Sequence, residues 1–81
     1  MPEAAPTQPF YLIVADHGRG VFAVEGPMTD DLPWKLAAAQ ARDGRVVCGP
    51  TGADRDALAA EYRRTHNLAG VPPGSIVRPR P

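Results

Sequence analysis

The residues best suited to proton-transfer chemistry lie together in one glycine-containing segment, Asp16-His17-Gly18-Arg19-Gly20. A general acid/base site needs a histidine that is held in position, often by a carboxylate, and Asp16 directly precedes His17. Aspartate and glycine are also ordinary formers of hairpin turns. Because the sequence indicates neither a nucleophile nor a shaped pocket beside these residues, we expect a turn here and do not expect an enzyme.

A second candidate site lies where a predicted strand meets a predicted helix, in residues 49–55. Backbone N–H groups at a helix N-terminus attract anions, and Thr51, Gly52 and Arg55 would form the candidate anion site. The segment is not a P-loop, because the glycine spacing differs and the Lys-Ser/Thr pair is missing. Two neighbouring aspartates would repel an anion, and a capped strand-to-helix turn explains the same residues without a ligand. Both interpretations stay open.

Metal-ligand residues are few and scattered. Besides two methionines, the soft ligand types are His17, Cys48 and His66. They lie far apart in the chain and show none of the paired spacings, such as C-x-x-C, that zinc sites have. We therefore expect no metal and no cofactor, and we interpret Cys48 as a small buried strand residue.

The apolar runs and the turn formers between them predict six elements in the order ββαβαβ. The expected strands are 10–15, 21–25, 45–48 and 75–77, and the expected helices are 32–43 and 54–66. The Gly-Pro pairs at 26–27 and 49–50 are expected to end the second and third strands. In the first helix, Leu32, Leu36 and Ala39 make one apolar line, and a neighbouring line holds Trp34, Ala38 and Ala41.

This order predicts a small α+β domain in which a β-hairpin is followed by two helix crossovers in a mixed four-stranded sheet. Each strand–helix–strand unit implies parallel strands and a right-handed crossover. If both crossovers step in the same direction, both helices cover one face of the sheet; if the direction reverses, they cover opposite faces. We expect both helices on one face, because four short strands and two helices hardly fill three layers.

The first strand is apolar at every position from 10 to 15, whereas a sheet covered on one side should show alternation. With helices on one face only, the sheet would leave an open apolar face for a partner or a second copy. The candidate contact residues are Tyr11, Ile13, Val21, Ala23 and, if it is exposed, Trp34. Alternatively, the N-terminal tail, the C-terminus or a three-layer arrangement covers this face.

The chain has no net charge, yet its two halves differ. Residues 1–41 carry two basic and five acidic side chains, and residues 42–81 carry seven basic and four acidic ones. The arginine-rich half could bind nucleic acid or a phosphate ligand with a steep dependence on salt. A solvated surface explains the same charges, and the neutral total argues against a general nucleic-acid binder.

Length and composition predict one domain over residues 10–77, a flexible tail at 1–9 and a Pro/Arg tail at 78–81. The single cysteine excludes an internal disulfide and suits a reducing compartment. The start lacks signal-peptide features, and the longest apolar run is too short to span a membrane. We expect a cytoplasmic protein without a membrane partner, and the Ala, Arg, Pro and Gly content suggests a bacterial source.

These observations favour a protein-interaction or adaptor module, or a homodimer, that acts through an apolar sheet face. Weak binding of nucleic acid or of a phosphate ligand by the arginine-rich half is the alternative.

Overall fold

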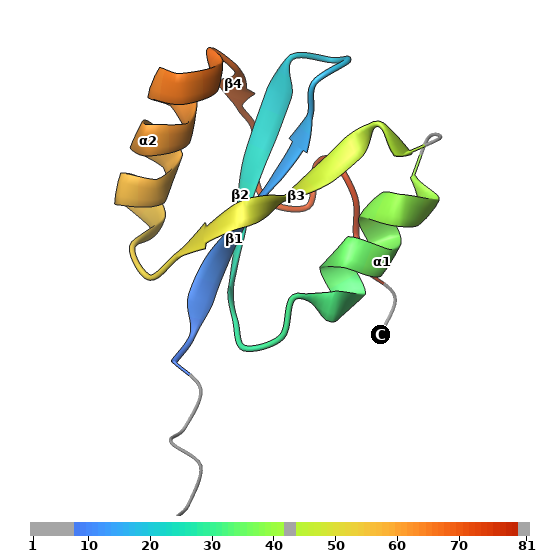
Figure 1. The fold of residues 1–81 in the computed structure, drawn as a ribbon, viewed down its shortest axis with the longest axis horizontal. Coiled ribbons are helices and arrows are strands. Elements are labelled where there is room, and N and C mark those ends of the chain that lie inside the picture. The colour runs from blue at the N-terminus through green and yellow to red at the C-terminus, as the bar shows by residue number, and fades with distance from the viewer. Residues whose placement is uncertain (1–7, 42–43, 80–81) are drawn as a thin grey trace, which may run out of the picture.

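The computed structural model describes residues 8–41 and 44–79. The elements are β1 (Phe10–Asp16), β2 (Val21–Met28), α1 (Leu32–Gln40), β3 (Val46–Gly52), α2 (Arg55–His66) and β4 (Ala69–Gly70). They form one sheet in the order β3-β1-β2-β4 (Figure 1). β1 is antiparallel to both of its neighbours, and β2 is parallel to β4. The predicted α+β domain, its hairpin and its mixed four-stranded sheet are confirmed.

The two helices lie on opposite faces of this sheet, which Figure 1 shows between α2 and α1. The α2-side core consists of Ile13, Ala15, Phe22, Leu58 and Tyr62. The α1-side core consists of Leu12, Val14, Ala38 and Val46. The prediction that both helices cover one face is therefore wrong.

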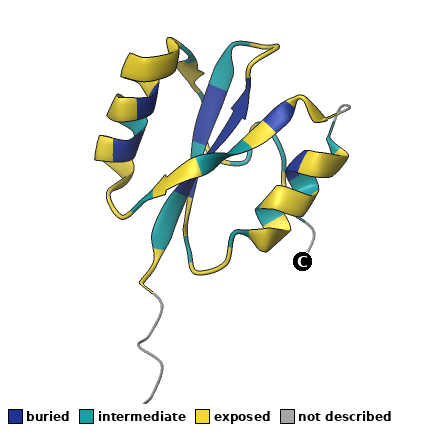
Figure 2. Ribbon diagram, viewed as in Figure 1, coloured by how far each residue is buried: buried dark blue, intermediate teal, exposed yellow. Residues whose placement is uncertain are grey.

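The reason is the strand order. The first crossover runs from β2 past β1 to β3, and the second returns from β3 past β1 and β2 to β4. Crossovers of one hand that run in opposite directions put their helices on opposite faces. This arrangement also explains the continuous apolar run of the first strand, because both faces of β1 are covered and residues 12–15 have no exposed surface (Figure 2).

The two Gly-Pro pairs do not end their strands as predicted. β2 continues to Met28 and β3 continues to Gly52. In both strands the register against β1 slips by one residue at the glycine, and Gly26 and Gly49 have φ angles of 131° and 110°. A bulge tolerates proline because its extra residue is left out of the ladder. Glycine supplies the positive φ, so each pair bends its strand without ending it.

The last strand lies earlier in the chain than predicted. Asn67 ends α2 in the left-handed conformation, with φ at 52°, and β4 pairs with the edge of β2 two residues later. Residues 75–77 are not in a strand. Instead, Ile76 and Val77 pack against the α1-side core. Because β4 already occupies the free edge of β2, these side chains cover the core and add no strand.

Each helix begins with an aspartate near its N-terminus. In α2, Asp54 accepts a hydrogen bond of 3.1 Å from the backbone N–H of Ala57. Asp30 accepts one of 3.0 Å from the N–H of Leu32, the first residue of α1. Such acceptors satisfy N–H groups that have no partner inside the helix. α1 ends at Gln40, three residues earlier than predicted.

Residues 1–7 of the predicted tail 1–9 and residues 80–81 of the predicted tail 78–81 lie outside the described residues. Within residues 8–41 and 44–79, neither helix has the length and apolar character that a membrane crossing requires.

Candidate docking groove beside helix α1

Helix α1 has one apolar line in contact with the sheet and another in solvent. Trp34 and Ala41 are half-buried and Ala38 is buried, so the line of these three residues packs on the sheet. The second line is exposed, with Leu32 at 56% and Leu36 at 55% of their maximal surface. The outer face of α1 is thus an apolar surface that the described residues leave exposed.

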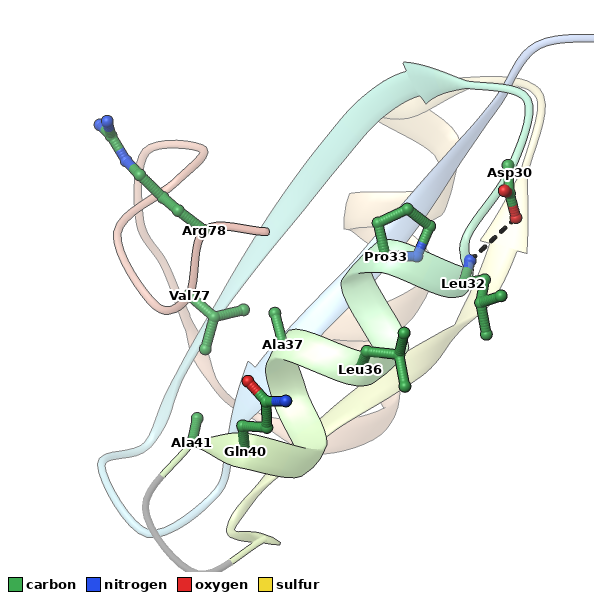
Figure 3. Close-up of a pocket in the computed structure, with 9 residues that line it drawn as sticks. All are labelled: Asp30, Leu32, Pro33, Leu36, Ala37, Gln40, Ala41, Val77 and Arg78. Carbon is green, nitrogen blue, oxygen red and sulfur yellow. Dashed lines mark hydrogen bonds between the residues drawn. The ribbon is translucent and has the colours of Figure 1, made fainter. Parts of the chain in front are cut away.

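A groove of about 560 Å³ runs beside α1. It is lined by Asp30, Leu32, Pro33, Leu36, Ala37, Gln40, Ala41, Val77 and Arg78. Figure 3 shows Val77 across the groove from Ala37 of α1 and from Ala41, four residues later at the C-cap of this helix. Residues at this spacing share one face of a helix. Their small side chains leave the space that makes the groove.

The rim of the groove is polar and carries both signs of charge. Asp30 lies beside Leu32 at the start of α1, and Arg78 lies on the C-terminal segment at the other side (Figure 3). One turn along α1, Lys35 forms an ion pair of 3.1 Å with Asp31. An apolar centre inside a polar rim is the usual composition of a protein interface.

Glu25 binds the C-terminal segment three residues before Val77, which lines the groove. Its side chain is only 3% exposed and accepts a hydrogen bond of 2.6 Å from the backbone N–H of Gly74. Burial raises the pKa of Glu25, while the Gly74 hydrogen bond and the charge of Arg78 act in the opposite direction. We did not predict this contact, because the residues around Glu25 do not show where the C-terminal segment lies.

Comparison with protein-family models, with curated proteins and with solved structures finds no match to this chain. The function therefore has to be inferred from the residues themselves.

Trp34 and Cys48 belong to the support of α1. The thiol of Cys48 donates a hydrogen bond of 3.5 Å to the carbonyl oxygen of Trp34. Burial raises the pKa of the Cys48 thiol, and the charge of Asp31 adds to this effect more than Lys35 offsets it. A protonated thiol is a poor nucleophile and a poor metal ligand. Trp34 is a half-buried core residue, so it is not the exposed anchor that the sequence left open.

The predicted contact residues of the sheet do not form one open face. Ile13 and Ala23 are fully buried, and Tyr11 and Val21 are half-buried. Tyr11 and Ile13 lie under α2. The register places Val21 opposite Asp16, on the other face. The physical reason is again the reversal of the crossovers, which covers both faces of the sheet.

The hairpin residues with acid/base character, Asp16 and His17, bind different partners. Asp16 is buried and accepts a hydrogen bond of 3.1 Å from the backbone N–H of Arg19. A hydrogen bond of 3.1 Å joins His17 Nε2 to Tyr62 Oη, and His66 stacks on Tyr62. Burial raises the pKa of Tyr62. Asp16 therefore stabilises the turn, and His17 packs against α2.

The predicted anion site has the geometry of a capped turn. Thr51 and Gly52 end β3, and Arg55 begins α2. Because Asp54 accepts from the Ala57 N–H, a carboxylate of the chain already occupies this helix N-terminus. An incoming anion would meet that negative charge, so this geometry does not favour an anion at Thr51 and Gly52.

The metal-ligand residues do not gather at one point. His17 and His66 have ring centroids 5.6 Å apart at the end of α2, whereas Cys48 packs on the α1 side of the sheet. In the part of the chain that the structure describes, no group of three or more His, Cys, Asp or Glu residues could hold a metal ion.

Proposed function

We propose that this domain is a protein-interaction module that pairs with a second copy of itself through the outer face of α1 and the groove beside it. The observation that carries this proposal is the exposure of Leu32 and Leu36, each more than half, next to an apolar groove. Removing the exposed parts of these two leucines from water would contribute about 2–3 kcal/mol.

A second copy fits this surface because a ridge and a groove lie side by side on it. In a two-fold symmetric dimer each surface patch contacts its own equivalent. Leu36 of each copy can then enter the groove of the other, where the small side chains of Ala37 and Ala41 allow a close approach. The charges agree with this pairing, since Asp30 of one copy can approach Arg78 of the other.

Light scattering coupled to size-exclusion chromatography tests the proposal on the full chain over a wide range of concentration. We expect a dimer that dissociates on dilution, and we expect Leu36→Glu to be monomeric, because a carboxylate would be buried without a partner. Val47→Glu is the matched control. Val47 is also exposed, at 44%, but belongs to β3.

Circular dichroism confirms that both variants are folded. A wild-type chain that stays monomeric up to about 1 mM contradicts the self-pairing. Equal dissociation by Val47→Glu and Leu36→Glu contradicts the assignment to α1. If the chain stays monomeric and binds a different protein through Leu36, that protein is the partner and a second copy is not.

Binding of nucleic acid or of a phosphate ligand by the arginine-rich half stays an alternative prediction. It needs several arginines on one face, whereas Arg63 belongs to α2 on one side of the sheet and Arg78 lies beside α1 on the other. Absence of any low-salt gel shift would count against it, because such binding strengthens as salt falls. We also propose a cytoplasmic location, which a single cysteine without a disulfide partner suits.

A further inference from the structure

A second hollow lies on the opposite side of the sheet from α1, between α2 and the segment that contains β4. Its volume is about 230 Å³. It is lined by Phe22, Val24, Arg55, Asp56, Ala59, Arg63, Gly70, Val71 and Pro73. It shares no residue with the α1 groove.

The floor of this hollow is apolar, and two positions in its walls, Ala59 and Gly70, carry small residues. Phe22 is buried in the α2-side core, and Val24 packs against that core. Ala59 gives the helix wall little side-chain volume. At Gly70, a Cβ atom would lie only 2.9 Å from Nη2 of Arg63. The glycine thus makes room for the Arg63 guanidinium over the edge of the sheet.

Two guanidinium groups stand above this floor. Arg55, Ala59 and Arg63 follow one another at intervals of four, so they form one row along α2. Within residues 8–41 and 44–79, no carboxylate lies within ion-pair distance of Arg63. Arg55 contacts Asp56 at 3.4 Å, but the Asp56 side chain is 88% exposed, so this pair is weak.

We propose that this hollow binds a small monocarboxylate with a branched aliphatic or aromatic body. The carboxylate would bind Arg63, and Arg55 would turn from Asp56 to share it, because a guanidinium matches a carboxylate in two parallel hydrogen bonds. The apolar body would lie on Phe22, Val24 and Val71.

The size and charge of the hollow select this class of ligand. Drug-sized ligands occupy pockets of about 300–1,000 Å³, so a hollow of about 230 Å³ suits a smaller molecule. Inorganic phosphate would leave the half-buried side chains of Val24 and Val71 in contact with water. Phosphate also carries more negative charge than a monocarboxylate, and the Asp56 carboxylate, which lines the hollow, would repel this additional charge.

Amide chemical shifts of the full chain, followed during titration with phenylacetate, test the proposal. We expect saturable shifts at Phe22, Ala59 and Gly70. Neutral phenylacetamide and inorganic phosphate are the comparison ligands. Each should bind about tenfold more weakly or worse, because one lacks the charge and the other the apolar body.

Three variants, each checked for folding by circular dichroism, separate a built site from a general attraction to arginines. Arg63→Gln should weaken phenylacetate binding about tenfold, and Ala59→Leu should abolish it by filling the hollow. Arg64→Gln is the matched control, because Arg64 neighbours Arg63 on α2 but pairs with Glu61. It should bind as the wild type does.

Three results would overturn the proposal: no saturable binding up to about 20 mM, equal binding of phosphate, or equal losses in the Arg63 and Arg64 variants. Leu36→Glu does not touch this hollow, so the outcome is independent of the proposed self-pairing.

Discussion

Two carboxylates, Asp16 and Glu25, are buried on the sheet and are held in different ways. Asp16 accepts from the Arg19 N–H inside its own turn. Glu25 accepts from Gly74, 49 residues along the chain. A local contact of the first kind follows from turn chemistry. The second depends on where the C-terminal segment lies, so it could not be predicted from the residues around Glu25.

The raised pKa of Glu25 makes folding stability depend on pH. Burial raises this pKa above its ordinary value of 4.5, against the Gly74 hydrogen bond and the charge of Arg78. The unfolded chain therefore loses this proton at lower pH than the folded chain does. As pH rises above 4.5 toward the folded-state pKa, the contribution of Glu25 to stability falls.

Glu25→Gln keeps an oxygen acceptor for the Gly74 N–H and cannot ionise. We expect the variant to gain stability relative to the wild type between acid and neutral pH, and the gain to level off above the folded-state pKa. Urea unfolding of both proteins from pH 4 to pH 8 measures it. Glu61→Gln, on the exposed side of α2, controls for the loss of one charge. Parallel pH profiles for the wild type and Glu25→Gln would sink this explanation.

At the scale of elements, periodicity and turn formers predicted the hairpin and both helices. The end of α2 at the left-handed Asn67 depends on the local sequence, so it could be predicted from the residues themselves. The prediction that the Gly-Pro pairs end their strands was wrong because a bulge depends on the register against β1. The residues of the pairs do not determine that register. The strand predicted at 75–77 misled because strand propensity does not show which sheet edge is free.

The candidate groove was partly visible in the sequence. The two apolar lines of α1 are recognisable from their spacing. Their spacing alone does not show which line packs on the sheet, and the structure exposes the line with Leu32 and Leu36. The burial of Ile13 and Ala23 needed the strand order.

Gly26 tests the role of the bulge in β2. A Cβ atom at this position would lie 2.8 Å from the backbone oxygen of Phe10, and its φ is 131°. We expect Gly26→Ala to lower the free energy of unfolding by about 3 kcal/mol or more, since backbone strain adds to the clash. Gly20→Ala is the matched control, because Gly20 also has a positive φ but nothing within 4 Å of its Cβ position.

The control variant should lose only about 1 kcal/mol, the cost of a left-handed alanine. Urea unfolding followed by circular dichroism gives both values. Equal losses in the two alanine variants would mean that the contact with Phe10 has no part in the effect.

At the scale of the whole molecule, β1 joins the two halves of the core. Its alternate side chains enter the α2-side core and the α1-side core. Both helices pack on this one sheet, and both cores contain side chains of β1. Neither core can therefore stay folded when β1 unfolds. We therefore expect one cooperative unfolding transition, as is usual for single domains of this size.

Ile13→Ala tests this coupling from one face to the other. Ile13 is fully buried in the α2-side core, and its truncation should lower the free energy of unfolding by about 2–5 kcal/mol. Trp34, the one tryptophan of the chain, lies on the opposite face of the sheet. Its fluorescence should report the same shifted urea midpoint as circular dichroism. A Trp34 midpoint that stays at the wild-type value would mean that the two faces unfold separately, because a cavity under α2 would then leave the packing of α1 intact.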